Sequence, residues 1–109
     1  MVFTALVRSD ADVAAVAATR AVTVKDPLTN YDALSDKVSQ ADVVFNTATA
    51  DDVPLNEAIL RGCKKRFEDG RGVGTLIHTS GTANFTDGRT DGKFDPQARI
   101  WTVSSNMLI

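Results

Sequence analysis

The stretch that decides the fold runs from residue 42 to residue 79 and reads DVVFNTATADDVPLNEAILRGCKKRFEDGRGVGTLIHT. It opens and closes with short apolar runs, Asp42 to Ala48 and Gly74 to Thr79, which predict two strands. Between them apolar residues recur at every fourth position: Leu55, Ile59, Cys63 and Phe67. This spacing predicts a helix with one apolar stripe facing a sheet, begun near Pro54 and ended by DGRGVG.

Two more strand–helix units precede this stretch. Val2 to Val7 (VFTALV) predicts a buried strand, and residues 11–20 (ADVAAVAATR) predict the helix after it. Ala21 to Lys25 predicts a second strand, and residues 31–40 (YDALSDKVSQ) a helix with Leu34 and Val38 on one face. The expected N-terminal caps of the three helices are Ser9 or Asp10, Thr29 or Asn30, and Asp51 or Asp52.

The resulting order, β-α-β-α-β-α-β, predicts an α/β fold with a parallel sheet and helical crossovers. We expect one such domain over residues 1–84. Residues 85–109 are expected to form a polar, glycine-rich loop followed by an extension that the pattern does not place.

Composition narrows the function classes. The chain has 109 residues, of which 43% are hydrophobic, and a net charge of −2 without a basic stripe, so nucleic acid is not an expected partner. No apolar run is long enough for a membrane span, and Met1 to Asp10 lacks the features of a signal peptide. Cys63 has no second cysteine for a disulfide or a metal site, and a cytoplasmic location is expected.

In open parallel sheets, ligands bind at the carboxyl ends of the strands. Polar or small residues stand at each of these ends: Arg8-Ser9, Asp26-Pro27, Asn46-Thr47-Ala48, and His78-Thr79-Ser80-Gly81. The Arg8 guanidinium suits a ribose 2′-phosphate, which distinguishes NADP from NAD, although an isolated arginine is more commonly solvated. Ser9 either joins that contact or caps the helix.

Most of the other reactive side chains have structural interpretations. A lone histidine at a strand end, such as His78, is more often structural than catalytic. Cys63 falls on the apolar stripe and is interpreted as core, and residues 61–66 (RGCKKR) as the solvated face of a helix. Ser80 is the best-placed hydroxyl for chemistry, but no histidine, lysine or tyrosine stands at a spacing that would activate it.

The segments TALVRS, ADVVFNTATADD, ILRGCKKRFEDG and LIHTSGT, in this order, resemble the atypical or extended short-chain dehydrogenase/reductase family. The likeness is to fungal NmrA-like or epimerase-like NAD(P)-binding proteins and covers roughly residues 2 to 84. It implies a three-layer Rossmann-like sheet and NADP as cofactor, with NAD as the alternative. The positions that the resemblance assigns to the cofactor are Arg8, Ser9, Asp26, Leu28, Thr47, Ala48 and Thr79. It assigns Ser80 a catalytic role beside the reacting carbonyl.

Two features depart from that family. No glycine occurs before Gly62, so the family's first strand, glycine-rich turn and first helix are absent, and the chain is expected to be truncated. The tyrosine–lysine pair expected after Ser80 is also absent, since Tyr31 is the single tyrosine. The missing strand is central in the family's sheet. Three outcomes are expected for the strands on either side of it. They pair directly with each other, or another chain fills the gap or associates through the open edges, or the chain is only marginally folded.

These observations predict an NAD(P)-binding domain fragment related to NADP-dependent oxidoreductases or epimerases of small carbonyl or hydroxyl compounds. The alternatives are a non-catalytic NmrA-like dinucleotide sensor and a truncated product without independent activity. Expected partners are a dinucleotide and a small-molecule substrate.

Overall fold

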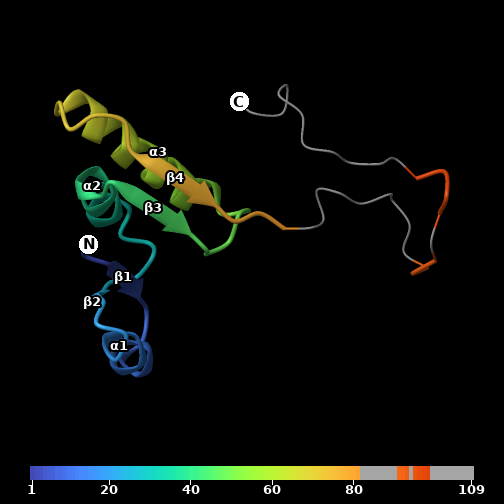
Figure 1. Ribbon diagram of the computed structural model, residues 1–109, viewed down its shortest axis with the longest axis horizontal. Helices are drawn as coiled ribbons and strands as arrows, with labels where there is room; N and C mark the ends of the chain where they lie inside the picture. The colour runs from blue at the N-terminus through green and yellow to red at the C-terminus, as the bar shows by residue number, and fades with distance from the viewer. Residues whose placement is uncertain (82–90, 94, 99–109) are drawn as a thin grey trace. The chain divides into compact units, whose positions relative to one another are not determined.

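The computed structural model describes residues 1–81, 91–93 and 95–98, and the chain divides into two compact units, 1–79 and 80–109. The first unit holds four strands and three helices (Figure 1). The strands are β1 (Thr4–Val7), β2 (Val22–Lys25), β3 (Val43–Asn46) and β4 (Thr75–His78). The helices are α1 (Asp10–Ala17), α2 (Tyr31–Gln40) and α3 (Val53–Glu68). The predicted alternation of strands and helices is confirmed.

The helices begin at side chains that satisfy free backbone donors. Ser9 Oγ accepts a hydrogen bond from Asp12 N, Asn30 Oδ1 from Ala33 N, and Asp52 Oδ1 from Leu55 N. Each cap is one of the two residues expected at that helix. The caps fix where each helix starts, and so which residues remain in the preceding loop.

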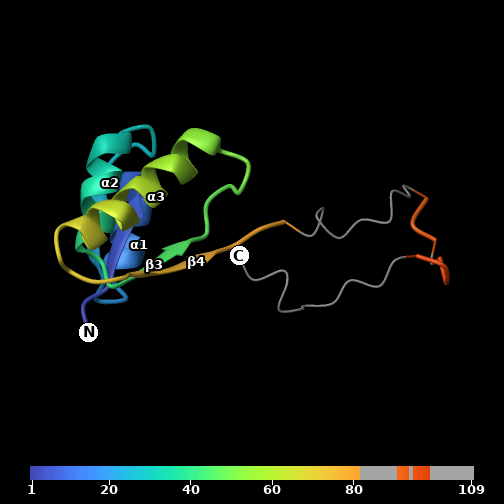
Figure 2. The ribbon, with the colours of Figure 1, turned by 90° about the horizontal axis from the view of Figure 1, so that it is seen from above.

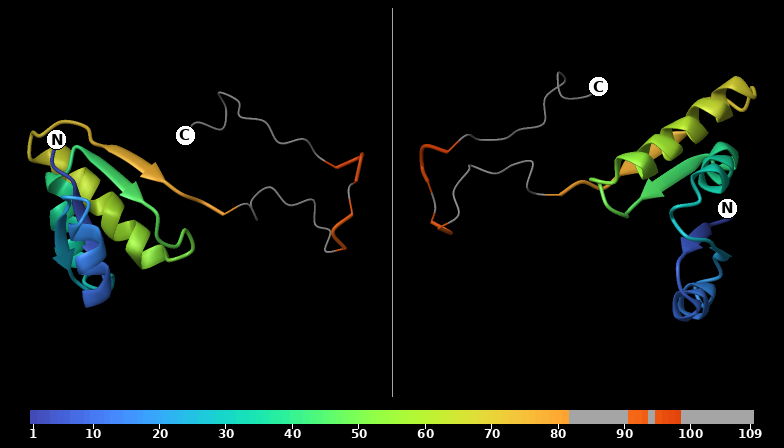
Figure 3. Two further views of the ribbon diagram at one scale, coloured as in Figure 1. Left: turned by 60° about the horizontal axis from the view of Figure 1, so that its bottom comes forward. Right: turned by 180° about the vertical axis from the view of Figure 1, so that it is seen from behind.

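The strands form two separate parallel pairs. β1 pairs with β2 in the register Leu6↔Val24, and β3 pairs with β4 in the register Phe45↔Ile77 (Figure 3). Each sheet has two strands, so β1 and β3 do not pair directly. The structure is therefore mixed α/β with parallel strands. Direct pairing of β1 with β3, one of three expected outcomes of the missing strand, does not occur.

The core lies between α2, α3 and one face of the β3–β4 sheet. Figure 2 shows the two helices side by side on that face. Val38, Leu55 and Ile59 are buried at its centre, and partly buried residues pack around them: Leu28, Tyr31, Leu34, Val44, Cys63 and Leu76. The core assignments of Leu34, Val38 and Cys63 are confirmed. On the opposite face, Val43, Phe45 and Ile77 are exposed, because strand residues alternate between faces.

The predicted apolar stripe of α3 is wrong at its far end. Phe67 is 63% exposed, whereas Arg66 is buried. Steps of four residues advance by roughly 40° around a helix, so Phe67 has turned roughly 120° away from Leu55, while Arg66 lies within roughly 20° of it. Arg66 Nη2 donates to Asp42 Oδ1 at 2.6 Å. Residues 61–66 are therefore only partly a solvated face, because Arg61, Lys64 and Lys65 are exposed whereas Gly62 and Arg66 are buried.

The first strand is shorter and less buried than the sequence pattern predicts. Val2 and Phe3 precede β1 and are exposed, and only Val7 of the strand is buried. Helix α1 covers one side of the β1–β2 pair with two half-buried valines, Val13 and Val16, and contributes no buried residue. This part of the chain has too few apolar contacts for a full core.

The expected boundary at residue 84 falls outside the described residues, and most of the expected extension 85–109 does too. Within it, residues 91–93 and 95–98 form no helix or strand. Asp91 and Asp95 accept backbone hydrogen bonds from Lys93 and Gln97.

An exposed ion pair ties α2 to α3. Lys65 Nζ donates to Asp36 Oδ1 at 2.6 Å, which holds the pKa of Asp36 below its ordinary value and raises the pKa of Lys65. A lowered carboxyl pKa contributes stability above the ordinary aspartate pKa, about 3.9, and that stability is lost as the pH falls through the lower folded-state value.

We expect Asp36→Asn to lower the urea midpoint slightly at neutral pH and to have no effect in acid, where both chains carry an uncharged side chain. Urea titrations followed by circular dichroism at the two pH values measure this. A difference of equal size at both would show that Asp36 acts through packing instead of charge.

Candidate functional site

The carboxyl ends of β1 and β3 border one cavity of about 450 Å³ in the first unit. Its lining residues come from β1 and the turn after it, α1, the loop before α2, and the loop after β3. They are Leu6, Val7, Arg8, Asp12, Val16, Leu28, Thr47, Ala48 and Thr49. The volume falls within the range of small-molecule sites, about 300–1,000 Å³. We call this cavity the β1–β3 cavity.

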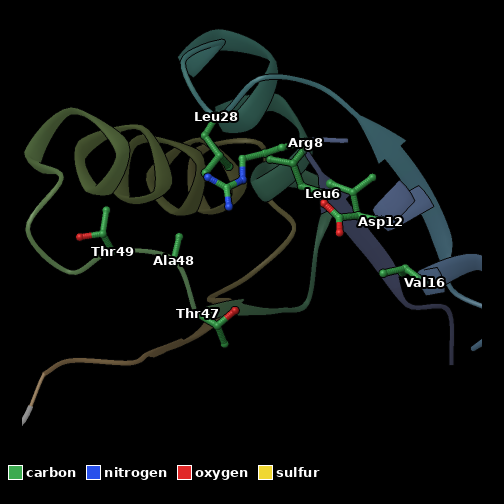
Figure 4. Close-up of a pocket in the computed structure, with 9 residues that line it drawn as sticks. Leu6, Arg8, Asp12, Val16, Leu28, Thr47, Ala48 and Thr49 are labelled. Atoms are coloured by element: carbon green, nitrogen blue, oxygen red, sulfur yellow. The ribbon is translucent and has the colours of Figure 1, made fainter. Parts of the chain in front are cut away.

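Four of the seven predicted cofactor residues line the β1–β3 cavity: Arg8, Leu28, Thr47 and Ala48. Figure 4 shows the Arg8 guanidinium extending from the end of β1 toward the side of the cavity formed by residues 47–49. Arg8 takes part in none of the ion pairs that the described part of the chain forms. Its donors therefore remain available to a ligand.

The other predicted site residues lie outside the cavity lining. Ser9 is committed to the start of α1, where its Oγ accepts from Asp12 N and donates to Asp12 Oδ2 at 2.7 Å. Asp26 accepts a hydrogen bond from Asn30 Nδ2, and Thr79 N donates to Asn46 O at 2.9 Å. Ser80 is the first residue of the second unit and is exposed. The structure therefore brings together predicted residues that follow β1, β2 and β3, and not those that follow β4.

Asp12 is a cavity residue that the sequence pattern did not single out. It lies in the first turn of α1, four positions after Arg8, and its carboxylate borders the same space as the guanidinium (Figure 4). A carboxylate repels a phosphate and accepts hydrogen bonds from ribose hydroxyls. The cavity thus offers both a positive and a negative side chain to a ligand.

Asn46 was expected only as one of the polar residues at the end of its strand, but it is 5% exposed and its side chain is fully hydrogen-bonded at the end of β3. Its Oδ1 accepts from Ala48 N at 3.1 Å, and its Nδ2 contacts Asn56 Oδ1 at 2.9 Å and His78 Nδ1 at 3.1 Å. These bonds hold the turn after β3 in place and so position Thr47 and Ala48 at the cavity.

Comparisons with protein-family models, with curated proteins and with solved structures find no match to this chain. None of the helices in the described part has the length and apolar character needed to cross a membrane. The function of the β1–β3 cavity is therefore inferred from its residues and their chemistry.

Proposed function

We propose that the β1–β3 cavity binds the adenosine end of NADP, and that this chain is an NAD(P)-binding domain related to short-chain dehydrogenases/reductases and epimerases. The single observation that carries the proposal is the gathering of Arg8, Leu28, Thr47 and Ala48 around one cavity. These residues come from three separate loops. The family resemblance selects all four, and the carboxyl-end rule alone selects Arg8, Thr47 and Ala48.

The residues fit the adenosine end of the cofactor. Arg8 has donors free of ion pairs within the described chain, and a guanidinium forks well onto a phosphate. Leu28 supplies an apolar wall suited to an adenine face, and Ala48 is small enough to allow close approach. NADP would supply the hydride chemistry of a complete oxidoreductase, and Arg8 would hold its 2′-phosphate.

We further propose that the two strand pairs are the flanks of one three-layer Rossmann-like sheet, with another strand between β1 and β3. Both pairs are parallel, and both β1 and β3 have one edge without a strand partner in the described part. Their carboxyl ends border the same cavity, as expected of strands that flank a common neighbour. The exposed Val43, Phe45 and Ile77 would then be covered by a further helix layer.

The balance between Arg8 and Asp12 decides the cofactor preference, and nucleotide titrations test the proposal. We expect Arg8→Ala to weaken NADPH binding roughly ten- to hundredfold, because charge-assisted hydrogen bonds contribute about 1.5–3 kcal/mol. NADH binding should change little. Asp12→Asn should strengthen NADPH binding and weaken NADH binding, because it removes a carboxylate that repels phosphate and accepts from ribose.

Isothermal titration of both nucleotides into the wild-type chain and the two variants measures these affinities. Lys25→Ala, a change of another exposed cation that pairs with Asp10 outside the cavity lining, is the control and should leave both affinities unchanged. Equal losses of NADPH affinity in the Arg8 and Lys25 variants would show that net charge, and not a site, attracts the nucleotide.

A non-catalytic dinucleotide sensor of the NmrA-like kind is the second candidate. The observation that favours it is the position of Tyr31, the single tyrosine, which packs against the core cluster at the start of α2. Its backbone oxygen accepts from Arg61, and the side chain does not line the cavity. A sensor would bind NADPH without oxidising it when small ketones are added, whereas an oxidoreductase would consume it, with Ser80 beside the reacting carbonyl.

A further inference from the structure

A chain of hydrogen bonds at the carboxyl ends of β3 and β4 fixes the orientation of two side-chain amides. Asn46 Oδ1 accepts from Ala48 N, which is only a donor, and Asn56 Nδ2 donates at 2.9 Å to Ala50 O, which is only an acceptor. Asn56 therefore presents its oxygen to Asn46 Nδ2. Neither amide can be reversed without breaking a bond to the backbone.

The orientation of Asn46 decides the tautomer of His78. Asn46 Nδ2 carries hydrogens only, and it lies 3.1 Å from His78 Nδ1, so Nδ1 must accept. The neutral imidazole in this hydrogen bond therefore carries its proton on Nε2.

The ring that carries this proton borders a second, smaller cavity. It has a volume of about 260 Å³ beside α3 and β4 and is lined by Asn56, Ile59, Leu60, Leu76 and His78. Its walls are mainly aliphatic, and His78 is the exposed polar residue among those that line it with Asn56. None of the nine residues of the β1–β3 cavity belongs to it.

We infer that this second cavity is a binding site for a small, largely apolar molecule with a neutral oxygen acceptor such as a ketone, and that His78 Nε2–H donates to that oxygen. A neutral imidazole donor matches a carbonyl better than a carboxylate, which would draw a second proton onto the ring. The aliphatic walls supply apolar contact, and Asn46 is the positioning residue that keeps the ring proton on Nε2. This goes beyond the nucleotide site and does not depend on it.

Nitrogen-15 NMR of the full chain tests the inference directly. His78 is the only histidine, so the imidazole signals can be assigned to it without comparison with other histidines. The wild-type chain at neutral pH should show the tautomer with the proton on Nε2. Cyclohexanone, added as the probe, should shift the Nε2 signal and the amide signals of Leu60 and Leu76. A wild-type ring with its proton on Nδ1, or an Nε2 signal that cyclohexanone leaves unmoved, would overturn it.

Two variants sharpen the test. His78→Phe keeps an aromatic wall and removes the donor, so cyclohexanone should bind about fivefold more weakly, as expected for one neutral hydrogen bond of about 1 kcal/mol. Asn46→Asp replaces the amide donor by an acceptor and should move the proton to Nδ1. Unchanged ketone affinity in His78→Phe, or an unchanged tautomer in Asn46→Asp, would contradict the roles assigned here. If Asn46→Asp does not fold, the wild-type tautomer and the His78→Phe titration still decide.

Discussion

Replacing Gly62 by alanine should lower the free energy of unfolding by about 1–3 kcal/mol, the range for overpacking a close contact. An added Cβ would lie 2.6 Å from Ser35 O and 2.6 Å from Val38 Cβ, where α2 and α3 cross. Ser35 O is a backbone atom of α2, so the helices must separate to make room. Alanine favours the helix intrinsically by roughly 1 kcal/mol, which offsets only part of this loss.

Urea unfolding followed by circular dichroism measures the effect. Lys64→Ala, an exposed position on the same helix, is the control and should change stability by less than about 0.5 kcal/mol. If Gly62→Ala proved as stable as the control, α2 and α3 would not approach as closely as described. Because α2 and α3 enclose most of the buried core, their separation should also broaden the unfolding transition.

The second large effect is expected at Leu55, which is 2% exposed and the most buried large side chain of the described chain. Leu55→Ala should lower the free energy of unfolding by about 2–5 kcal/mol, the range for leucine-to-alanine changes in cores. The loss is large for this chain because only two other large apolar residues, Val38 and Ile59, are buried in the same cluster. We expect the variant to be largely unfolded near room temperature.

Leu60→Ala provides a matched control, since it makes the same chemical change on the same helix at a side chain that is 59% exposed. It should shift the urea midpoint by much less than Leu55→Ala. Similar effects of the two changes would mean that α3 does not present Leu55 to β3 and β4, and the assignment of the core face would be wrong.

The starts of the helices followed from sequence because local chemistry defines them, whereas α1 ends at Ala17, three residues before its predicted end. The predicted segment 31–40 coincides with α2, and the three caps are side chains that satisfy backbone donors within three residues. All four strands were predicted to be longer than they are, because pairing with a neighbour and not composition decides where a strand stops. Val2, for example, suits a strand but lies before the first paired residue, Thr4.

Burial was harder to predict than secondary structure. An apolar spacing of four residues suggested that Phe67 faces the core, yet the helix rotates it outward and turns Arg66 inward. Arginine is rarely buried, so composition gave no warning. Its partner, Asp42, lies 24 positions earlier in sequence, and only the assembled helix and strand bring the two together.

The candidate site was predictable only in part, because some of its contacts join residues that are distant in sequence. The carboxyl-end rule selected Arg8, Thr47 and Ala48 because it depends on strand direction alone, and these residues do border one cavity. The rule carries no information about neighbours that approach from a helix, and so it did not select Asp12. It also selected Asn46 and His78 only as members of polar stretches, because their hydrogen bond depends on the register between β3 and β4.

Thermal unfolding of the chain with and without NADPH, followed by circular dichroism, tests the proposed nucleotide site most directly. A ligand that binds only the folded state stabilises it by about 2.7 kcal/mol at a hundredfold excess over Kd. We predict a cooperative transition that moves to higher temperature with NADPH, moves less with NADH, and moves least for Arg8→Ala with NADPH. A wild-type transition that NADPH leaves in place would contradict the assignment of the β1–β3 cavity.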